Sequence, residues 1–271
     1  MATLSPMIQQ YLDIKQQHKD KILFFRLGDF YEMFFDDAIN VSRELELTLT
    51  GKDCGMQERA PMCGIPYHSS EVYIKRLIDK GYKVAICEQV ENPATAKGLV
   101  KREVVRLVTP GTVIESSLLS EESNNFIASV INQKNLFAIC FVDISTGDVF
   151  LTEQKASKTS IEIINELSKF SPSEVLLNDN ILQYKGIIDF IKNKLNCVCE
   201  IYGKDEVDEN ACLTTVLNHF KGKTIEQLNL TDKNLAVTAL GSLISYINKT
   251  QKNGAMRIVN VNFYKDDEYM C

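Results

Sequence analysis

The chain has 271 residues, of which 45% are hydrophobic and 24% are charged, and a formal net charge of −6. This length suits about two domains, and the composition excludes disordered and collagen-like proteins. No stretch approaches about 18 uninterrupted apolar residues, and the first thirteen residues lack the pattern of a signal peptide. We therefore expect a cytoplasmic protein without a membrane partner, whose eight cysteines are thiols.

The charge is unevenly distributed along the chain. Residues 1–115 carry 15 basic and 16 acidic side chains, whereas residues 116–271 carry 15 and 20. A net negative chain is poorly suited to coat nucleic acid by bulk electrostatics. Any contact with nucleic acid should therefore come from a local patch in the first half.

Hydrophobic periodicity in the first half predicts a mixture of helices and strands. Gly28-Asp29 separates two Phe-rich runs and suits a two-residue type II′ hairpin turn. In chain order we expect a helix over 6–18, strands over 22–27 and 30–35, a helix over 36–45, a polar loop over 50–61, a stiff turn over 64–66, a helix over 70–80, and strands over 83–90 and 103–108.

The second half begins with alternating apolar patterns and continues as alternating strands and helices, which is typical of an α/β domain. We expect a β-meander over 126–131, 136–143 and 149–152, helices over 160–170, 187–195, 210–221 and 232–252, and strands over 174–177 and 197–201. The fold class is therefore α/β with two domains. The polar, Ser/Asn-rich segment 115–125 predicts a first domain over 1–115, a linker over 116–123 and a second domain over 124–253.

The segment Phe24–Phe35 offers the strongest candidate site. On a strand, Phe30 and Glu32 project to one face, and Tyr31 and Met33 project to the other. A strand Phe is more often a core residue, but a Glu on the same face weakens that interpretation because an unpaired buried carboxylate is costly. An exposed ring could wedge between stacked bases while the carboxylate hydrogen-bonds a base edge. Because phosphates repel an ionised carboxylate, we hypothesise that Glu32 is at least partly protonated.

Three other features have ordinary explanations as well as functional ones. Gly64–His68 reads as a turn before a helix, and Lys97–Arg106 is a local basic cluster that could be a solvated face. Asp143 could seed a metal-nuclease site, although its position before a turn next to Asp148 favours a structural role. The three histidines are widely scattered, so we expect no metal site.

Several strings together, in this order, resemble the amino-terminal part of the MutS family of DNA mismatch-recognition proteins. The resemblance is dense over the first 115 residues, and weaker marks over 143–147 resemble the connector domain of that family. The strings are Thr3–Tyr11, Phe25–Ala38, Pro61–His68, Val84–Gln89, Pro93–Lys97 and Val104–Thr112.

The resemblance implies a mixed α/β mismatch-binding domain followed by a ribonuclease-H-like α/β connector domain, with residues 254–271 beginning a truncated core/lever domain. It implies that Phe30 is the wedge that stacks on a mispaired base from the minor groove and that Glu32 hydrogen-bonds that base. Contacts to the DNA backbone are expected, by charge, from Arg102, Arg106, Lys75 and Arg76.

The resemblance also implies partners. They are mismatched double-stranded DNA, a downstream repair protein of the MutL type bound by the connector, and a second copy in a homodimeric parent that acts at the bacterial nucleoid. ATP and Mg²⁺ would belong to ATPase domains outside this chain, so we expect no cofactor and no enzymatic activity here. Two alternatives stay open: a ribonuclease-H-like metal nuclease using Asp143, and a module that only binds proteins.

Overall fold

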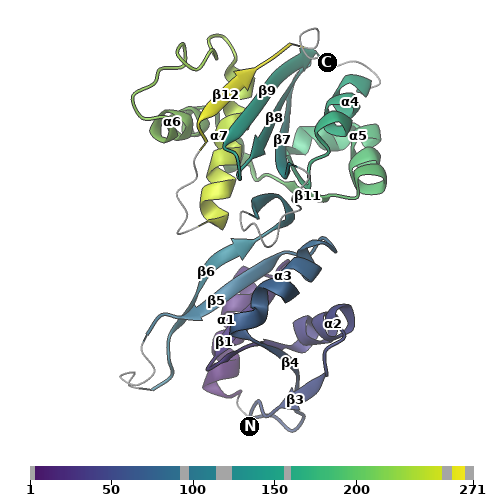
Figure 1. Ribbon diagram of the computed structural model, residues 1–271, viewed down its shortest axis with the longest axis vertical. Helices are drawn as coiled ribbons and strands as arrows, with labels where there is room; N and C mark the ends of the chain where they lie inside the picture. The colour runs from purple at the N-terminus through teal and green to yellow at the C-terminus, as the bar shows by residue number, and fades with distance from the viewer. Residues whose placement is uncertain (1–3, 92–97, 114–123, 156–159, 252–257, 266–271) are drawn as a thin grey trace. The chain divides into compact units, whose positions relative to one another are not determined.

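The computed structural model describes residues 4–91, 98–113, 124–155, 160–251 and 258–265, which form two compact units, Met1–Pro110 and Gly111–Cys271. Figure 1 shows each unit as a sheet with helices packed on it. The expected linker 116–123 and the string Pro93–Lys97 lie outside the described residues. Over the described ranges, no helix is long and apolar enough to cross a bilayer.

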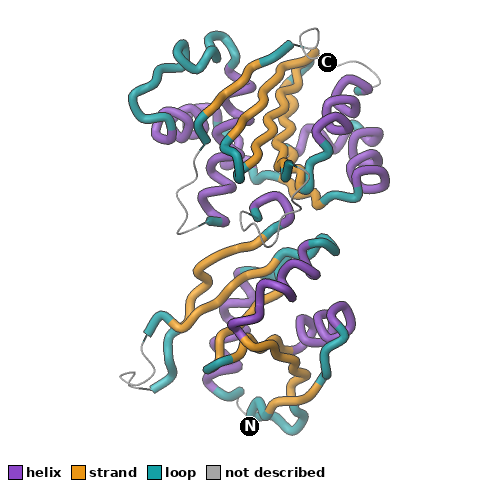
Figure 2. The backbone as a smooth tube through the Cα atoms, in the orientation of Figure 1, coloured by secondary structure: helices purple, strands orange, loops and turns teal. Residues whose placement is uncertain are grey.

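The first unit contains a six-stranded sheet in the order β3-β4-β2-β1-β5-β6, with three helices. Figure 2 shows the strands in orange and the helices in purple. The bounds are α1 Pro6–Gln17, β1 Ile22–Leu27, β2 Phe30–Phe34, α2 Phe35–Leu45, β3 Thr50–Lys52, β4 Ala60–Pro66, α3 Ser70–Ile78, β5 Val84–Gln89 and β6 Arg102–Val108.

Helix α1 covers one face of the first sheet. The Tyr11 ring makes edge contacts with the rings of Phe25 and Phe34, at centroid distances of 5.4 and 4.9 Å. Alternate residues of a strand point to the same face, so Phe34 shares its face with Phe30 and Glu32. Phe30 and Glu32 therefore project from the α1 side of the sheet.

Helices α2 and α3 cover the opposite face. Gly64 pairs with Glu32 across the β2–β4 ladder, so the next residue along β4, Cys63, points away from Glu32. The Cys63 thiol donates to the carbonyl of Ala38 in α2, with an Sγ to O distance of 3.5 Å. Arg76 in α3 donates to the last turn of α2, so these two helices lie side by side.

The structure corrects two expectations in this unit. The predicted polar loop 50–61 contains strand β3, and the predicted turn 64–66 is the end of strand β4. Both errors have one cause. These segments are strands because they pair with neighbouring strands, and their Gly, Pro and polar residues have low strand propensity, so the local sequence does not indicate the pairing.

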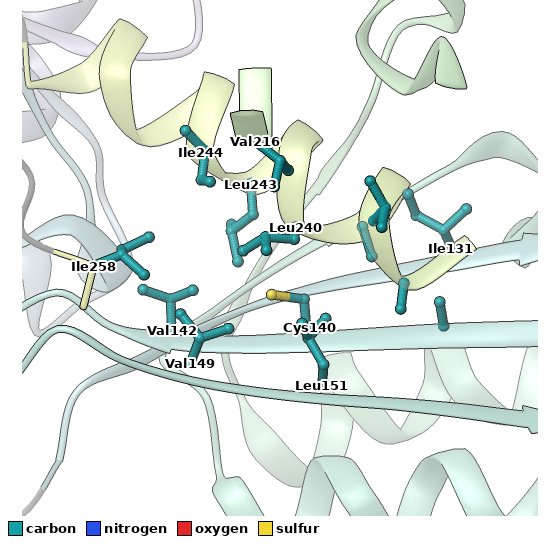
Figure 3. Close-up of a cluster of buried hydrophobic side chains, with 14 of the residues drawn as sticks. Ile131, Cys140, Val142, Val149, Leu151, Val216, Leu240, Leu243, Ile244 and Ile258 are labelled. Carbon is teal, nitrogen blue, oxygen red and sulfur yellow. The ribbon is translucent and has the colours of Figure 1, made fainter. Parts of the chain in front are cut away.

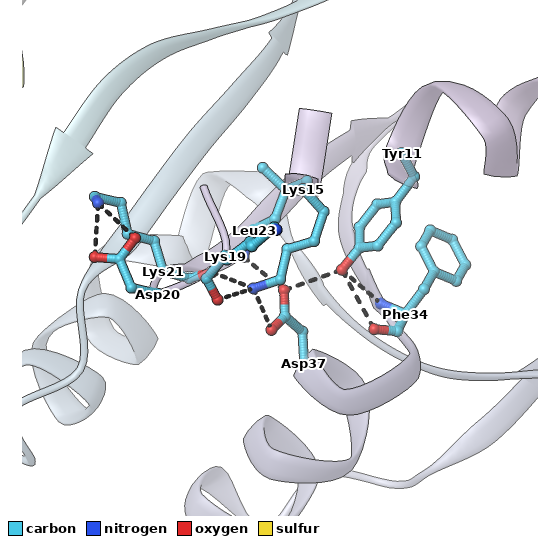
Figure 4. Close-up of polar contacts among 8 residues, drawn as sticks. All are labelled: Tyr11, Lys15, Lys19, Asp20, Lys21, Leu23, Phe34 and Asp37. Atoms are coloured by element: carbon cyan, nitrogen blue, oxygen red, sulfur yellow. Dashed lines mark hydrogen bonds and ion pairs between the residues drawn. The ribbon is translucent and has the colours of Figure 1, made fainter. Parts of the chain in front are cut away.

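A buried carboxylate ties the first helix, the first strand and the second helix together (Figure 4). Asp37 accepts hydrogen bonds from the Tyr11 hydroxyl at 3.0 Å and the Leu23 backbone N–H at 3.0 Å, and it pairs with the Lys15 ammonium at 2.9 Å. Asp37 lies in the first turn of α2, where it also neutralises a cation and satisfies a backbone donor. Buried polar groups need such partners, because unpaired ones are costly.

The second unit also contains a six-stranded sheet, in the order β11-β10-β7-β8-β9-β12. Strands β7, β8 and β9 are antiparallel neighbours, which confirms the β-meander, and β10 and β11 add in parallel. The bounds are β7 Phe126–Gln133, β8 Leu136–Asp143, β9 Asp148–Lys155, α4 Ile161–Phe170, β10 Glu174–Leu177, α5 Lys185–Phe190, β11 Val198–Ile201, α6 Glu209–His219, α7 Asn234–Thr250 and β12 Asn260–Phe263. This arrangement fits the expected two-domain α/β fold.

Both faces of the second sheet are buried under helices. Figure 3 shows Leu240, Leu243 and Ile244 of α7 lying against Cys140 and Val142 of the central strand β8. The intervening residues of β8 belong to a separate apolar cluster with α4 and α5. Burial on both faces explains why the strands are nearly continuous apolar runs.

The carboxyl-terminal part of the chain differs from the expectation. Residues 260–263 form β12, which pairs in parallel with β9 at the edge of the second sheet. The expectation that 254–271 begin a further domain is therefore wrong for this strand. Its polar and alternating sequence, Asn260–Phe263, gives a weak strand signal that only the pairing with β9 makes visible.

The cysteines are thiols throughout the part of the chain that the structure describes. Burial raises the pKa of Cys63 to about 12, with help from the Asp37 charge, and burial raises the pKa of Cys87 to about 12. The folded state therefore keeps these protons over a pH range in which the unfolded chain, with thiol pKa values of 9.0, releases them.

We predict that iodoacetamide at pH 8 labels Cys63 and Cys87 only after the chain is unfolded in urea. The reactive species is the thiolate, and the folded state withholds it. Stability from these two groups is complete below pH 9 and is lost as the pH rises from 9 toward 12. Peptide mass spectrometry measures the labelling, and rapid modification of both thiols in the folded chain would contradict this assignment.

Candidate nucleic-acid interface

The β1–β2 hairpin presents Phe30 at the first position of β2. Gly28 has a φ of +59°, and Asp29 is not among the residues with positive φ, as a type II′ turn requires. Phe30 pairs with Leu27 on one side and with Pro66 on the other. The ring is therefore held by a backbone that neighbouring strands fix on both sides.

The side chain of Phe30 lies outside the hydrophobic core. It is 47% exposed, whereas Phe24, Phe25 and Phe34 in the same hairpin are fully buried. Burial of apolar surface away from water lowers the free energy by roughly 25 cal/mol per Å². An exposed ring on a rigid hairpin is therefore available to bury itself against another molecule.

Contacts of Tyr67 and Arg26 support the hairpin. The Tyr67 backbone N–H donates to the Asp29 carbonyl at 3.0 Å, and the Arg26 guanidinium lies 3.4 Å from the centroid of the Tyr67 ring. Arg26 also donates to the Gly28 carbonyl at 2.5 Å. The signal in the sequence was the aromatic residue after Pro66, but its target could not be read without the fold.

Tyr31 anchors β2 on the opposite face. Its hydroxyl donates to the Glu88 carboxylate on β5, and Arg26 forms an ion pair with the same carboxylate at 3.6 Å. Burial, followed by the hydrogen bond to Glu88 and then the Glu88 charge, raises the pKa of Tyr31 above its ordinary value. Tyr31 therefore fixes β2 to β5 on one face of the sheet, while Phe30 projects from the other face.

Glu32 lies beside Phe30 on the α1 face, as expected, and it is paired. Its Oε2 atom lies 2.5 Å from the Lys52 ammonium, and the two side chains are 15% and 32% exposed. The strand partner of Glu32 is Gly64, so no side chain faces it directly across the β2–β4 ladder. The carboxylate thus stands next to the exposed ring with its charge compensated by a residue from β3.

Arg102 does not suit the predicted contact with DNA. The side chain is buried, and it donates to the Arg26 carbonyl at 2.7 Å and to Gln10 Oε1 at 2.9 Å. Its guanidinium also lies 4.9 Å from the centroid of the Phe25 ring. Arg102 instead joins α1 to the sheet, because its Nε and Nη1 donors are used inside the fold.

The other predicted basic residues do not gather around Phe30 in one patch. Arg106 is half-buried on β6, whereas Lys75 and Arg76 belong to α3, on the opposite face of the sheet from Phe30. Lys101, within the basic cluster 97–106, pairs with Glu103 at 2.6 Å. Lys97 lies outside the described residues. The contacts of these residues with DNA stay predictions.

Asp143 has a structural role at the end of β8. Its carboxylate accepts the Ser145 backbone N–H at 2.9 Å, the Ser145 hydroxyl at 2.6 Å and the Asn125 backbone N–H at 3.3 Å. Such bonds are typical of an Asp that caps a turn. In the described ranges, no group of three His, Cys, Asp or Glu side chains could hold a metal ion. The nuclease alternative therefore gains no support from Asp143.

The two units thus define a two-domain α/β protein that presents an aromatic ring and a paired carboxylate on its first sheet. The model of MutS domain I matches residues 5–117, and the model of MutS domain II matches residues 125–261. The chain belongs to the MutS family.

Curated relatives agree over the whole chain. The DNA mismatch repair protein MutS of Acetivibrio thermocellus is 49% identical over 270 residues, and that of Ruminiclostridium cellulolyticum is 47% identical over 270 residues. Each alignment covers 100% of this chain and 31% of the relative. The chain therefore spans about three tenths of the length of these relatives and corresponds to their mismatch-binding and connector domains.

Proposed function

We propose that the first unit recognises mismatched DNA by inserting the Phe30 ring beside a mispaired or unpaired base, where Glu32 hydrogen-bonds that base. The observation that carries this proposal is the 47% exposure of Phe30 in a hairpin whose other Phe side chains are buried. The neighbouring carboxylate lies on the same face of the sheet as the ring.

The physical basis of selectivity is the deformability of the duplex. Inserting an apolar side chain unstacks a base step at a cost of a few kcal/mol and kinks the helix. A mispaired step is already weakly stacked, so this cost is smaller there than at a paired step. A single ring and one hydrogen bond can then discriminate mismatched from matched DNA with little readout of sequence.

The second unit is proposed to act as a connector. It relays DNA binding to ATPase domains of a longer homodimeric protein, where ATP and Mg²⁺ bind, and it contacts a downstream repair protein of the MutL type. Its sheet is buried on both faces, and this supports the transmission of a rigid-body movement. No reaction is proposed for the chain itself.

The decisive experiment compares matched and single-mispair duplexes. The protein is a chimera in which these 271 residues replace the matching part of the Acetivibrio thermocellus relative, and binding is measured by fluorescence anisotropy. We expect tighter binding to the mispaired duplex. The isolated chain, with its net charge of −6, should bind both duplexes weakly because it releases few counterions. Equal affinities of the chimera for the two duplexes would refute the proposed function.

Glu32→Gln and Glu32→Ala test the hydrogen bond separately from the wedge. Gln keeps the shape and can still bond a base edge, whereas Ala cannot, so we predict that E32A loses more mismatch preference than E32Q. A bond to a base edge is worth about 1–3 kcal/mol, or roughly 5- to 150-fold in the affinity ratio. Equal preferences in the two variant chimeras would exclude a hydrogen-bonding role for Glu32.

A further inference from the structure

We infer that Lys52 is a positioning residue for mismatch recognition: it holds one oxygen of Glu32, compensates the charge of this carboxylate beside the phosphates, and leaves the second oxygen to accept a hydrogen bond from the base. This inference rests on the proposed function, and it assigns a role to a residue in a segment whose sequence predicted only a polar loop.

The strand register places Lys52 on the correct face. Lys52 pairs with Ala60 on β4, and Gly64, four residues further along the same strand, pairs with Glu32. Residues directly opposite one another in an antiparallel ladder share a face, and residues at even spacing along a strand do so too. Lys52 and Glu32 therefore project from the same side of the sheet, although β4 separates their strands.

The Lys52 ammonium reaches Glu32 beside the aromatic ring of Phe34. The Lys52 ammonium lies 5.7 Å from the centroid of the Phe34 ring and 2.5 Å from Glu32 Oε2. A Cβ atom at Gly64 would lie 3.5 Å from Glu32 Cγ, which is ordinary van der Waals contact. The pair therefore depends on the reach of Lys52 from β3 rather than on steric exclusion at Gly64.

In this geometry the Lys52 ammonium compensates the negative charge of Glu32. An ionised carboxylate that approaches a groove lined by phosphates is repelled, and its desolvation is costly unless it is paired. Lys52 provides the pairing in the free protein, so protonation of Glu32 is not needed for close approach. Only Oε2 is held by the ammonium, and an ionised Oε1 can accept an N–H of a base.

Double substitutions in the chimera test this role. Lys52→Met removes the cation and keeps much of the chain length, so we expect the ratio of mismatched to matched affinity to fall about tenfold. In an E32Q background, K52M should cause no further fall, because no carboxylate is left to compensate. Lys52→Arg restores a cation and should recover most of the ratio.

A matched control is available in the same domain. Lys80, in the turn after α3, pairs with Glu44 of α2 at 2.8 Å, away from Phe30, and K80M should leave the affinity ratio unchanged. Urea denaturation of each variant shows whether the fold is intact. A loss of ratio in K52M that K52R does not recover would overturn the proposed role.

The alternative is a direct contact of Lys52 with phosphate. K52M would then weaken binding to matched and mismatched duplexes equally, would do so in the E32Q background too, and would reduce the salt slope by about one charge. That result overturns the positioning role and leaves the wedge intact. If Phe30→Ala retains full mismatch preference, the proposed function itself fails, so the two failures are distinguishable.

Discussion

Phe30→Ala should abolish most of the preference for mismatched over matched DNA while leaving the fold intact. The ring is 47% exposed, so truncation removes little buried surface from the hydrophobic core. In a complex, stacking of a base on an aromatic ring is worth about 1–3 kcal/mol, which corresponds to roughly 5- to 150-fold in affinity. That contribution falls mainly on the mismatched duplex, where the base step opens at least cost.

Two control variants test whether the effect is specific to the aromatic ring at position 30. Leu182→Ala truncates an apolar side chain of similar exposure, 48%, in the other unit, and we expect the affinity ratio of the chimera to be unchanged. Phe30→Tyr keeps an aromatic face and should retain more of the ratio than F30A does. Anisotropy titrations on paired duplexes measure the ratios, and an F30A ratio equal to that of the unsubstituted chimera would remove the wedge from the mechanism.

The hairpin shows how far the sequence alone could lead. The sequence predicted a tight turn at Gly28-Asp29, and the alternation along β2 predicted that Phe30 and Glu32 share a face. The structure confirms the turn and the shared face. The exposure of Phe30 did not follow from this pattern, because an aromatic residue on a strand is more often buried. A tertiary feature decides it: α1 covers the buried part of this face, including Phe25 and Phe34, and Phe30 is exposed.

Charge alone was a poor guide to the rest of the site. Arg102 stood out in a basic cluster, yet its donors serve Arg26 and Gln10 inside the fold. Lys52 stood in an unremarkable polar segment, yet it reaches Glu32 across a strand from β3. Both outcomes depend on pairing between segments that are distant in sequence, and such pairing leaves no local signal.

The second unit contains the largest expected effect on stability. Gly241 lies within α7, where alanine is normally favoured over glycine by about 1 kcal/mol. A Cβ atom at this position would lie 2.4 Å from the carbonyl oxygen of Cys212 and 2.6 Å from its Cα atom in α6. These are backbone atoms of a packed helix, so neither can rotate away, and α6 would have to move.

Gly241→Ala should therefore destabilise the second unit by about 2–3 kcal/mol, the usual cost of an overpacked core. Gly186→Ala, at a helical position with nothing within 4 Å of the added Cβ atom, should be neutral or slightly stabilising. Urea denaturation followed by circular dichroism, with hydrogen exchange of α7 amides to locate the change, should show a midpoint lower by about 1 M for G241A. Equal midpoints for the two variants would mean that α6 and α7 do not pack backbone to backbone at Gly241. Gly241 and Phe30 belong to different compact units, so mismatch preference should survive G241A at temperatures where both units remain folded.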